Sequence, residues 1–146
     1  MTKTELYQKF LRDGHKDSFF PPPAVQHLNL DYFEYKEGEY LKHKAPVKPA
    51  YNNPGQVMFG GYYGMFFDAA YGPFSFIETQ KYAATLDMNM TFLKSVSPKD
   101  EYVITQANII SQSKSFLIMD AQMKKLDGTL VATSTTRMMI LDKAIT

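Results

Sequence analysis

The chain has 146 residues, of which 45% are hydrophobic, and its 16 lysines and arginines against 15 acids give a net charge of +1. This length fits one domain, residues 1–146, built around a single core. The near-neutral charge gives no electrostatic footprint for nucleic acid or a membrane surface. With no cysteine, a disulfide framework, a thiolate zinc site and a cysteine nucleophile are excluded. The N-terminus has no apolar signal core and no apolar run reaches about 18 residues, so we expect a cytoplasmic protein.

The first third of the chain contains few chemical signals. Thr2 and Glu5 match a capping box that predicts a short amphipathic helix ending near Asp13-Gly14. A proline-rich connector follows, and its centre cannot be helical. The three histidines also lie in this region, without metal-ligand spacing, and we expect each to be a surface or strand-edge residue: His15, His27 and His43.

Alternation and turn residues predict six strands. Two form an early hairpin, at 28–35 and 40–44. Four follow the central segment, at 85–92, 102–110, 116–126 and 129–141, and the short connections between them predict an antiparallel meander. In the first of these four strands, the apolar residues Leu86 and Met88 alternate with Thr85 and Asp87, which predicts one buried and one exposed face.

The segment Asn52–Phe76 is unlike the rest of the chain. After a loop and a short extended run, Gly60-Gly61 mark the start of a helix that is apolar on nearly every side. Such a helix should be buried on more than one side, and a curved antiparallel sheet wrapped around it follows from the pattern. The fold class is therefore α+β, with six strands, one long central helix and a short N-terminal helix.

Asp68 interrupts this apolar helix. A carboxylate in such surroundings must be paired, hydrogen-bonded or functional. The free N–H groups at Gly60-Gly61 can polarise a carbonyl, and an oxyanion donor with a base points to acyl transfer. Eight residues at about 1.5 Å each put Asp68 about 12 Å from Gly60. A complete site therefore needs Gly60 of one subunit and Asp68 of another, which predicts a dimer.

Other catalytic signatures are missing from the sequence. It contains no G-x-S-x-G, no P-loop, no G-x-G-x-x-G and no H-E-x-x-H. Serine hydrolases and nucleotide-binding folds are therefore excluded.

At these residues the sequence resembles the hotdog-fold acyl-CoA thioesterases of the phenylacetate-pathway type, over most of the chain. That family has an asparagine, a glycine two residues on, a His-Gly-Gly at the helix start, an aspartate midway along the helix and a serine or threonine opening the next strand. The matching positions here are Asn53, Gly55, Gly60-Gly61, Asp68 and Thr85. The strand text TLDMNMTFL and the closing LDGTLVATSTTRMMIL are similar too.

The resemblance implies a hotdog fold and hydrolysis of acyl-CoA thioesters without a metal or cofactor. It implies that the Gly60 N–H polarises the thioester carbonyl, that Asp68 of the partner subunit activates water or attacks directly, and that Asn53 and Thr85 orient water or carbonyl. It also implies a homodimer or homotetramer. Phe59 departs from the family pattern, because it stands where the family has histidine.

Each catalytic residue has a structural alternative. Asp68 could be an acid hydrogen-bonded to Tyr63 or Tyr71, Gly60-Gly61 could serve tight helix-to-sheet packing, and Asn53 could simply be a turn residue. Strict alternation turns Thr85 away from the helix, so its role requires a bulge, a strand-end twist or a site reached from the neighbouring subunit.

Four further residues are candidates for substrate binding. Gly61 and Phe59 flank the polarising N–H, and Phe67 belongs to an aromatic cluster that is mostly core but can also line an acyl pocket. Lys114, in the turn Ser113-Lys114-Ser115, can meet coenzyme A phosphates, although a hairpin lysine is usually only solvated.

Three functions compete. Hydrolysis of acyl-CoA leads, and the alternative is a non-catalytic hotdog protein that binds acyl-CoA or fatty acid, which Phe59 favours. A hotdog dehydratase or hydratase ranks last, because it needs a histidine beside the acid and all three histidines precede the motif.

Overall fold

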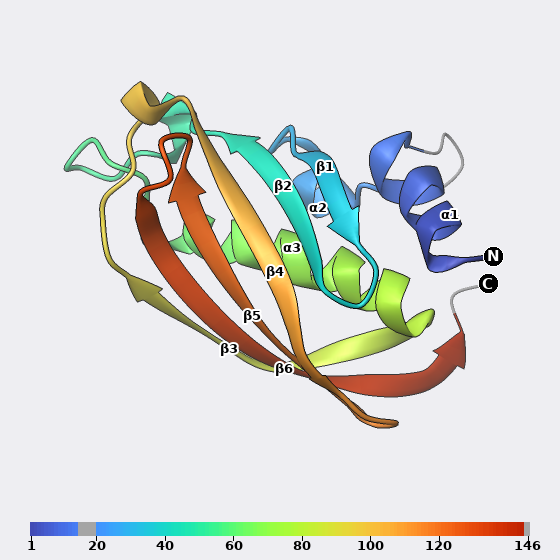
Figure 1. The fold of residues 1–146 in the computed structure, drawn as a ribbon. Coiled ribbons are helices and arrows are strands. Elements are labelled where there is room, and N and C mark those ends of the chain that lie inside the picture. The colour runs from blue at the N-terminus through green and yellow to red at the C-terminus, as the bar shows by residue number, and fades with distance from the viewer. Residues whose placement is uncertain (15–19, 145–146) are drawn as a thin grey trace.

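One long helix lies against the concave face of a curved six-stranded sheet (Figure 1). The computed structural model describes residues 1–14 and 20–144. The helices are α1 (Lys3–Tyr7), continued by the π-helical turn η1 (Gln8–Arg12), α2 (Pro23–Gln26) and α3 (Gly60–Thr79), with 3-10 turns η2 (Pro49–Tyr51) and η3 (Pro98–Asp100). The strands are β1 (Asp31–Lys36), β2 (Tyr40–Pro46), β3 (Lys81–Phe92), β4 (Tyr102–Gln112), β5 (Phe116–Lys125) and β6 (Leu130–Ala144).

The sheet is antiparallel throughout, in the order β1-β2-β4-β5-β6-β3. The predicted α+β class, the six strands and the central helix are confirmed, and this is the architecture of the hotdog fold. The predicted four-strand meander is wrong, because β3 pairs with β6 at the sheet edge and not with β4. Tight turns at Ser113-Lys114 and Asp127-Gly128 join β4, β5 and β6, whereas the longer connection 93–101 carries the chain across the sheet.

Helix α3 is buried on its sheet side and on both flanks. Phe66, Phe67 and Phe74 have no exposed surface, so burial on more than one side is confirmed. The helix begins at Gly60, as predicted, and ends where Gln80 takes the left-handed conformation with φ 55°. Only the stripe around Asp68 and Gly72 lies towards the open side.

Two side chains of the sheet donate hydrogen bonds to carbonyls of α3. Pro73 lies inside the helix and has no N–H for the carbonyl of Ala69, four residues before it. The Tyr32 hydroxyl of β1 donates to that carbonyl at 2.6 Å. One strand along, Nε2 of His43 lies 2.8 Å from the carbonyl of Phe66. The sheet therefore supplies a bond that the helix lacks and fixes how α3 is turned.

His43 is a buried residue, so the expectation of a surface or strand-edge histidine is wrong for it. Its strand, β2, lies between β1 and β4, and its side chain has no exposed surface. Burial lowers the pKa of His43 to about 4, which keeps the ring neutral. His27 is exposed, as expected, and His15 lies outside the described residues.

The N-terminal helix is tied to the C-terminal end of α3 by a buried carboxylate. The predicted capping box is present, with the Thr2 and Glu5 side chains bonding each other's backbone N–H groups, and the cap that ends η1 is Asp13, close to the predicted end. Lys3 Nζ lies 3.1 Å from Glu78, whose side chain also accepts from the Tyr35 hydroxyl at 2.7 Å. Sequence reasoning did not single out Glu78.

A double-mutant cycle tests whether Tyr32 replaces the bond that Pro73 removes. Tyr32→Phe should lower the free energy of unfolding by about 1–3 kcal/mol, because it leaves the buried Ala69 carbonyl unpaired. In a Pro73→Ala background the new N–H can donate to that carbonyl, so the same change should cost clearly less. Urea denaturation of the four proteins measures both costs. Equal costs in the two backgrounds would contradict this role of Tyr32.

Candidate active site

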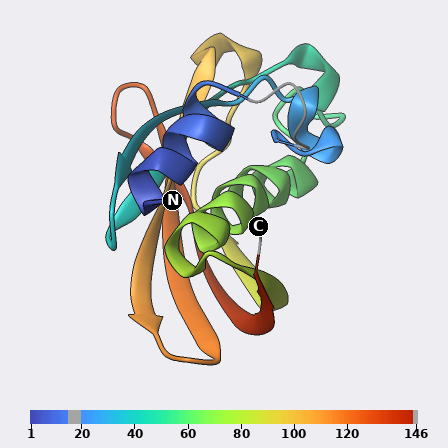
Figure 2. The same ribbon diagram turned by 90° about the vertical axis from the view of Figure 1, so that its right-hand side faces the viewer.

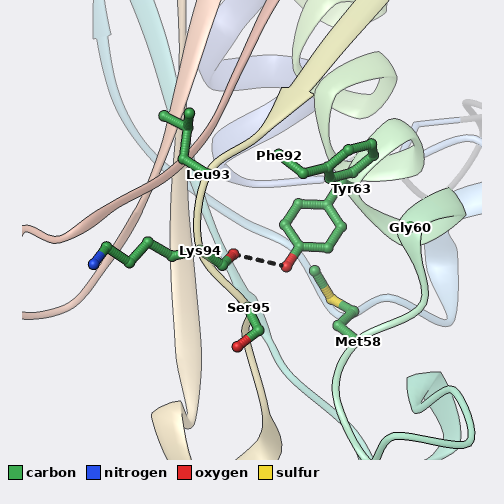
Figure 3. A pocket seen from close by; sticks show the side chains of 7 residues that line it. All are labelled: Met58, Gly60, Tyr63, Phe92, Leu93, Lys94 and Ser95. Carbon is green, nitrogen blue, oxygen red and sulfur yellow. Dashed lines mark hydrogen bonds between the residues drawn. The ribbon is translucent and has the colours of Figure 1, made fainter.

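The N-terminus of α3 opens into a hollow of about 350 Å³. The first N–H groups of a helix, here at Gly60 and Gly61, have no acceptor within the helix. The N-cap residue, Phe59, supplies no side-chain acceptor for them either. Figure 3 shows the Tyr63 hydroxyl directed at the Lys94 carbonyl, 3.4 Å away, while the Lys94 side chain extends away from the hollow. The lining residues are Met58, Gly60, Tyr63, Phe92, Leu93, Lys94 and Ser95.

Packing does not require glycine at the start of α3. A Cβ built on Gly60 would lie 3.6 Å from the Phe92 ring, and one on Gly61 would lie 3.4 Å from Phe59. Both are ordinary contacts. The close approach of helix to sheet occurs one turn later, where a Cβ on Gly64 would meet the Met90 side chain at 3.3 Å. Tight helix-to-sheet packing therefore explains the glycine at position 64 and not those at positions 60 and 61. The distinctive feature of Gly60-Gly61 is their N–H groups, which have no acceptor within the helix.

Asp68 is exposed on the open side of α3, yet apolar groups around it desolvate it in part. This desolvation raises the pKa of the Asp68 carboxyl above its ordinary value. Within residues 1–14 and 20–144, its carboxylate takes part in no hydrogen bond or ion pair. The structural alternative named two tyrosines, but the Tyr63 hydroxyl donates to the Lys94 carbonyl, and the buried Tyr71 hydroxyl has Ser134, not Asp68, as its polar neighbour.

A second hollow, of about 270 Å³, lies beside Asp68. It shares no lining residue with the hollow at Gly60. Both residues lie on α3, eight positions and so about 12 Å apart. One protomer therefore does not bring Gly60 and Asp68 to the same carbonyl.

A β-bulge determines the direction of Thr85. The register of β3 on β6 shifts between Thr85 and Asp87, so the alternation predicted for this strand is broken at Leu86. Thr85 pairs with Met138, which belongs to the core, and residues paired directly across strands share a face of the sheet. Thr85 therefore lies on the helix side of the sheet, while Leu86 is 54% exposed.

Asn53 organises the loop before α3. Its side-chain oxygen accepts from the N–H of Gly55 at 2.9 Å and from that of Val57 at 3.4 Å. Its own N–H donates to the Val57 carbonyl at 2.8 Å. The structure thus shows the turn role of Asn53, and its catalytic role stays a prediction.

The other substrate-binding candidates do not converge on one place. Phe59 is 58% exposed beside the helix start. Phe67 is fully buried, stacked on Tyr71 with ring centroids 6.5 Å apart, and lines neither hollow. Lys114 is exposed in the β4–β5 turn, at the far end of β4 from the helix start, on the order of 30 Å away at about 3.3 Å per residue. In one protomer, Phe67 and Lys114 therefore lie apart from the helix start.

The described residues contain neither a cluster of metal ligands nor a membrane-spanning helix. Among the described residues, no group of three or more histidine, aspartate or glutamate side chains is arranged to hold a metal ion. In the same residues, no helix is both long and apolar enough to cross a membrane.

The sequence matches a family model described as the Thioesterase superfamily over residues 55–132, which is more than half of the chain. The matched region includes both glycines of the helix start, Asp68 and Thr85. No curated protein matches the sequence significantly.

Solved structures share the fold at low sequence identity. The PaaI protein of Escherichia coli, from the phenylacetic acid degradation operon, has a TM-score of 0.77 at 18% identity, covering 84% of this chain and 87% of its own. A thioesterase from Haemophilus influenzae has a TM-score of 0.73 at 20% identity, with 82% and 83% covered. A Streptococcus mutans protein bound to acetyl-CoA has a TM-score of 0.73 at 21% identity, with 80% and 91% covered.

Proposed function

The chain belongs to the thioesterase superfamily, and from this premise we propose that it hydrolyses acyl-CoA thioesters to the free acid and coenzyme A. The observation that carries the proposal is the pair of groups on α3: an N-terminus at Gly60 without a side-chain cap, and a partly desolvated carboxylate at Asp68 that has no partner among the described residues. Coenzyme A is proposed as the carrier because a structural neighbour holds acetyl-CoA.

In the proposed reaction, the thioester carbonyl oxygen accepts from the Gly60 N–H at the positive end of the α3 dipole. Asp68 takes a proton from water while the water oxygen bonds to the carbonyl carbon. The C–S bond then breaks, the acid leaves, and the coenzyme A sulfur takes up the proton. Direct attack by the Asp68 carboxylate, followed by hydrolysis of the anhydride, is the alternative path. Thr85, turned to the helix side by its bulge, is proposed to orient the water or the carbonyl.

The proposed site is shared between two subunits. Gly60 and Asp68 lie too far apart in one protomer, so the Asp68 that serves each Gly60 comes from a second copy. Strand β3 supports this arrangement, because it is a 12-residue strand at the sheet edge, with Leu86 and Phe92 more than half exposed. Long edge strands with exposed apolar residues are usually covered in stable proteins. We therefore propose that two copies join edge to edge along β3.

The second candidate function is binding of acyl-CoA or fatty acid without turnover. The observation that favours it is Phe59, an exposed apolar residue where the family has histidine. Release of free thiol over a panel of acyl-CoA esters, from acetyl to palmitoyl and aryl, decides between the two functions.

Asp68→Asn tests the carboxylate. The variant keeps the shape of the side chain and removes its charge, so it should fold and bind acyl-CoA while turnover falls by about 10² or more. Because burial raises the pKa of Asp68, the acid limb of the kcat/KM profile of the unmodified protein should lie above the ordinary aspartate range and be absent in the variant. Asp13→Asn, on the exposed N-terminal segment, is the matched control. Turnover by folded Asp68→Asn within a few-fold of the unmodified protein would make Asp68 a structural acid.

Gly60→Pro tests the backbone donor. Proline is favoured at the first position of a helix, and Phe59, with ψ 137°, already has the extended backbone that a residue before proline needs. The helix should therefore persist without the N–H, and turnover should fall by about 10²–10³. Gly60→Ala keeps the N–H and adds a Cβ at an ordinary distance from Phe92, so it should lose far less. Similar turnover in the two variants, both shown folded by circular dichroism, would exclude the Gly60 N–H as the electrophile.

A further inference from the structure

The hollow beside Asp68 is formed by α3 and by the segment that contains α2. Figure 2 shows α2 beside α3. One stripe of the long helix makes the floor, and three residues of the α2 segment make the opposite wall. Every lining residue except Asp68 is apolar or glycine. The floor is Met65, Asp68, Ala69, Gly72, Pro73 and Phe76, and the wall is Pro22, Ala24 and Val25.

Gly72 keeps part of this hollow open. A Cβ built on Gly72 would meet no atom of the described residues within 4 Å. Glycine inside a helix costs about 1 kcal/mol relative to alanine, and among residues 1–14 and 20–144 no neighbouring group requires it here. The space above Gly72 is therefore open to another molecule or to a larger side chain.

The α2 wall is fixed in place. Leu28, just after α2, is fully buried. Lys48 Nζ donates to the His27 carbonyl at 2.7 Å and also to the Asn29 side chain. The Gln26 side chain donates to the Pro21 carbonyl at 3.1 Å. This wall lies outside residues 55–132, the part of the chain that matches the family model.

We infer that the hollow between α2 and α3 binds the acyl group of the thioester, and that the α2 wall and Gly72 set the size of acyl group accepted. The inference rests on the proposed function. If Asp68 activates water at the carbonyl carbon, the acyl chain and the coenzyme A sulfur bonded to that carbon lie on either side of the carboxylate. Coenzyme A is a polyanion and stays near solvent, whereas the acyl chain is apolar and matches the lining.

The size of the hollow gives the class of acyl group. Its volume of about 270 Å³ is just below the range of about 300–1,000 Å³ typical of small-molecule pockets. It therefore suits short, medium or phenyl-sized acyl groups better than long-chain ones.

The test compares kcat/KM for octanoyl-CoA and phenylacetyl-CoA with that for acetyl-CoA. Gly72→Leu places a side chain in the hollow without a backbone clash, and it should lower both ratios by at least 10-fold, since a single methylene in an apolar pocket is worth about 10–200-fold. Ala24→Phe, from the opposite wall, should shift the ratios in the same direction. Ala50→Leu adds the same apolar bulk at an exposed site outside the hollow and should leave both ratios unchanged. Unchanged ratios in folded Gly72→Leu and Ala24→Phe would overturn the inference.

A binding measurement separates failure of this inference from failure of the proposed function. If the unmodified protein releases no thiol from any ester, the proposed hydrolysis is wrong. The acyl site is then tested by measuring the affinities of octyl-CoA and ethyl-CoA thioethers by calorimetry. Tighter binding of the octyl compound, lost in Gly72→Leu, would support the site, and equal binding would overturn it. Dissociation of Gly72→Leu into monomers, seen by sedimentation, would also overturn it, because a second copy would then occupy the hollow.

Discussion

The orientation of α3 in the sheet depends on two hydrogen bonds from buried side chains to its carbonyls. Tyr32 and His43, on adjacent strands, donate to Ala69 and Phe66 at 2.6 and 2.8 Å. The Ala69 carbonyl has no helix donor because of Pro73, so losing Tyr32 leaves a buried acceptor unpaired, at a cost of about 1–3 kcal/mol. The two bonds hold one side of the helix to β1 and β2. They leave the stripe with Asp68 and Gly72 facing outward. The Gly60 end has no side-chain cap for a separate reason, because its N-cap residue is Phe59.

Local signals in the sequence predicted the local parts of this structure. The capping box at Thr2 and Glu5, the helix start at Gly60-Gly61 and the tight turns that join β4, β5 and β6 each depend on residues close together in the chain. The neighbour of β3 could not be predicted in the same way, because its pairing with β6 joins residues about 50 positions apart. The expectation that His43 is a surface or strand-edge residue was wrong for the same reason, because the position of β2 between β1 and β4 is not visible in the local sequence.

The candidate site shows the same division. The spacing of Gly60 and Asp68 predicted their separation, because helix geometry is regular. The direction of Thr85 depends on a β-bulge at Leu86, which the alternating sequence pattern does not reveal. The hollow beside Asp68 could not be predicted, because its α2 wall comes from residues some 40 positions away in the chain. Tyr32 has no local signal either, although a proline inside a helix shows that one carbonyl will need another donor.

The features left open in one protomer are those that a two-subunit site needs. A helix end without a side-chain cap, a carboxylate with no partner in the part of the chain that the structure describes, and a long edge strand all belong to α3 and β3. In a two-fold dimer, each contact of Gly60 with the partner's Asp68 is made twice, so the assembly contains two equivalent sites.

Subunit complementation tests the shared site most directly. Gly60→Pro and Asp68→Asn chains, carrying different affinity tags, are denatured, mixed in equal amounts and refolded. A mixed dimer then has one site with both residues intact and one site with neither, so the mixture should recover about a quarter of the unmodified activity, although each variant alone is nearly inactive. Tandem purification of the mixed dimer should raise this to about half. If the mixed dimer, verified by both tags, is no more active than its parents, then Gly60 and Asp68 do not act together across the interface and the account is wrong.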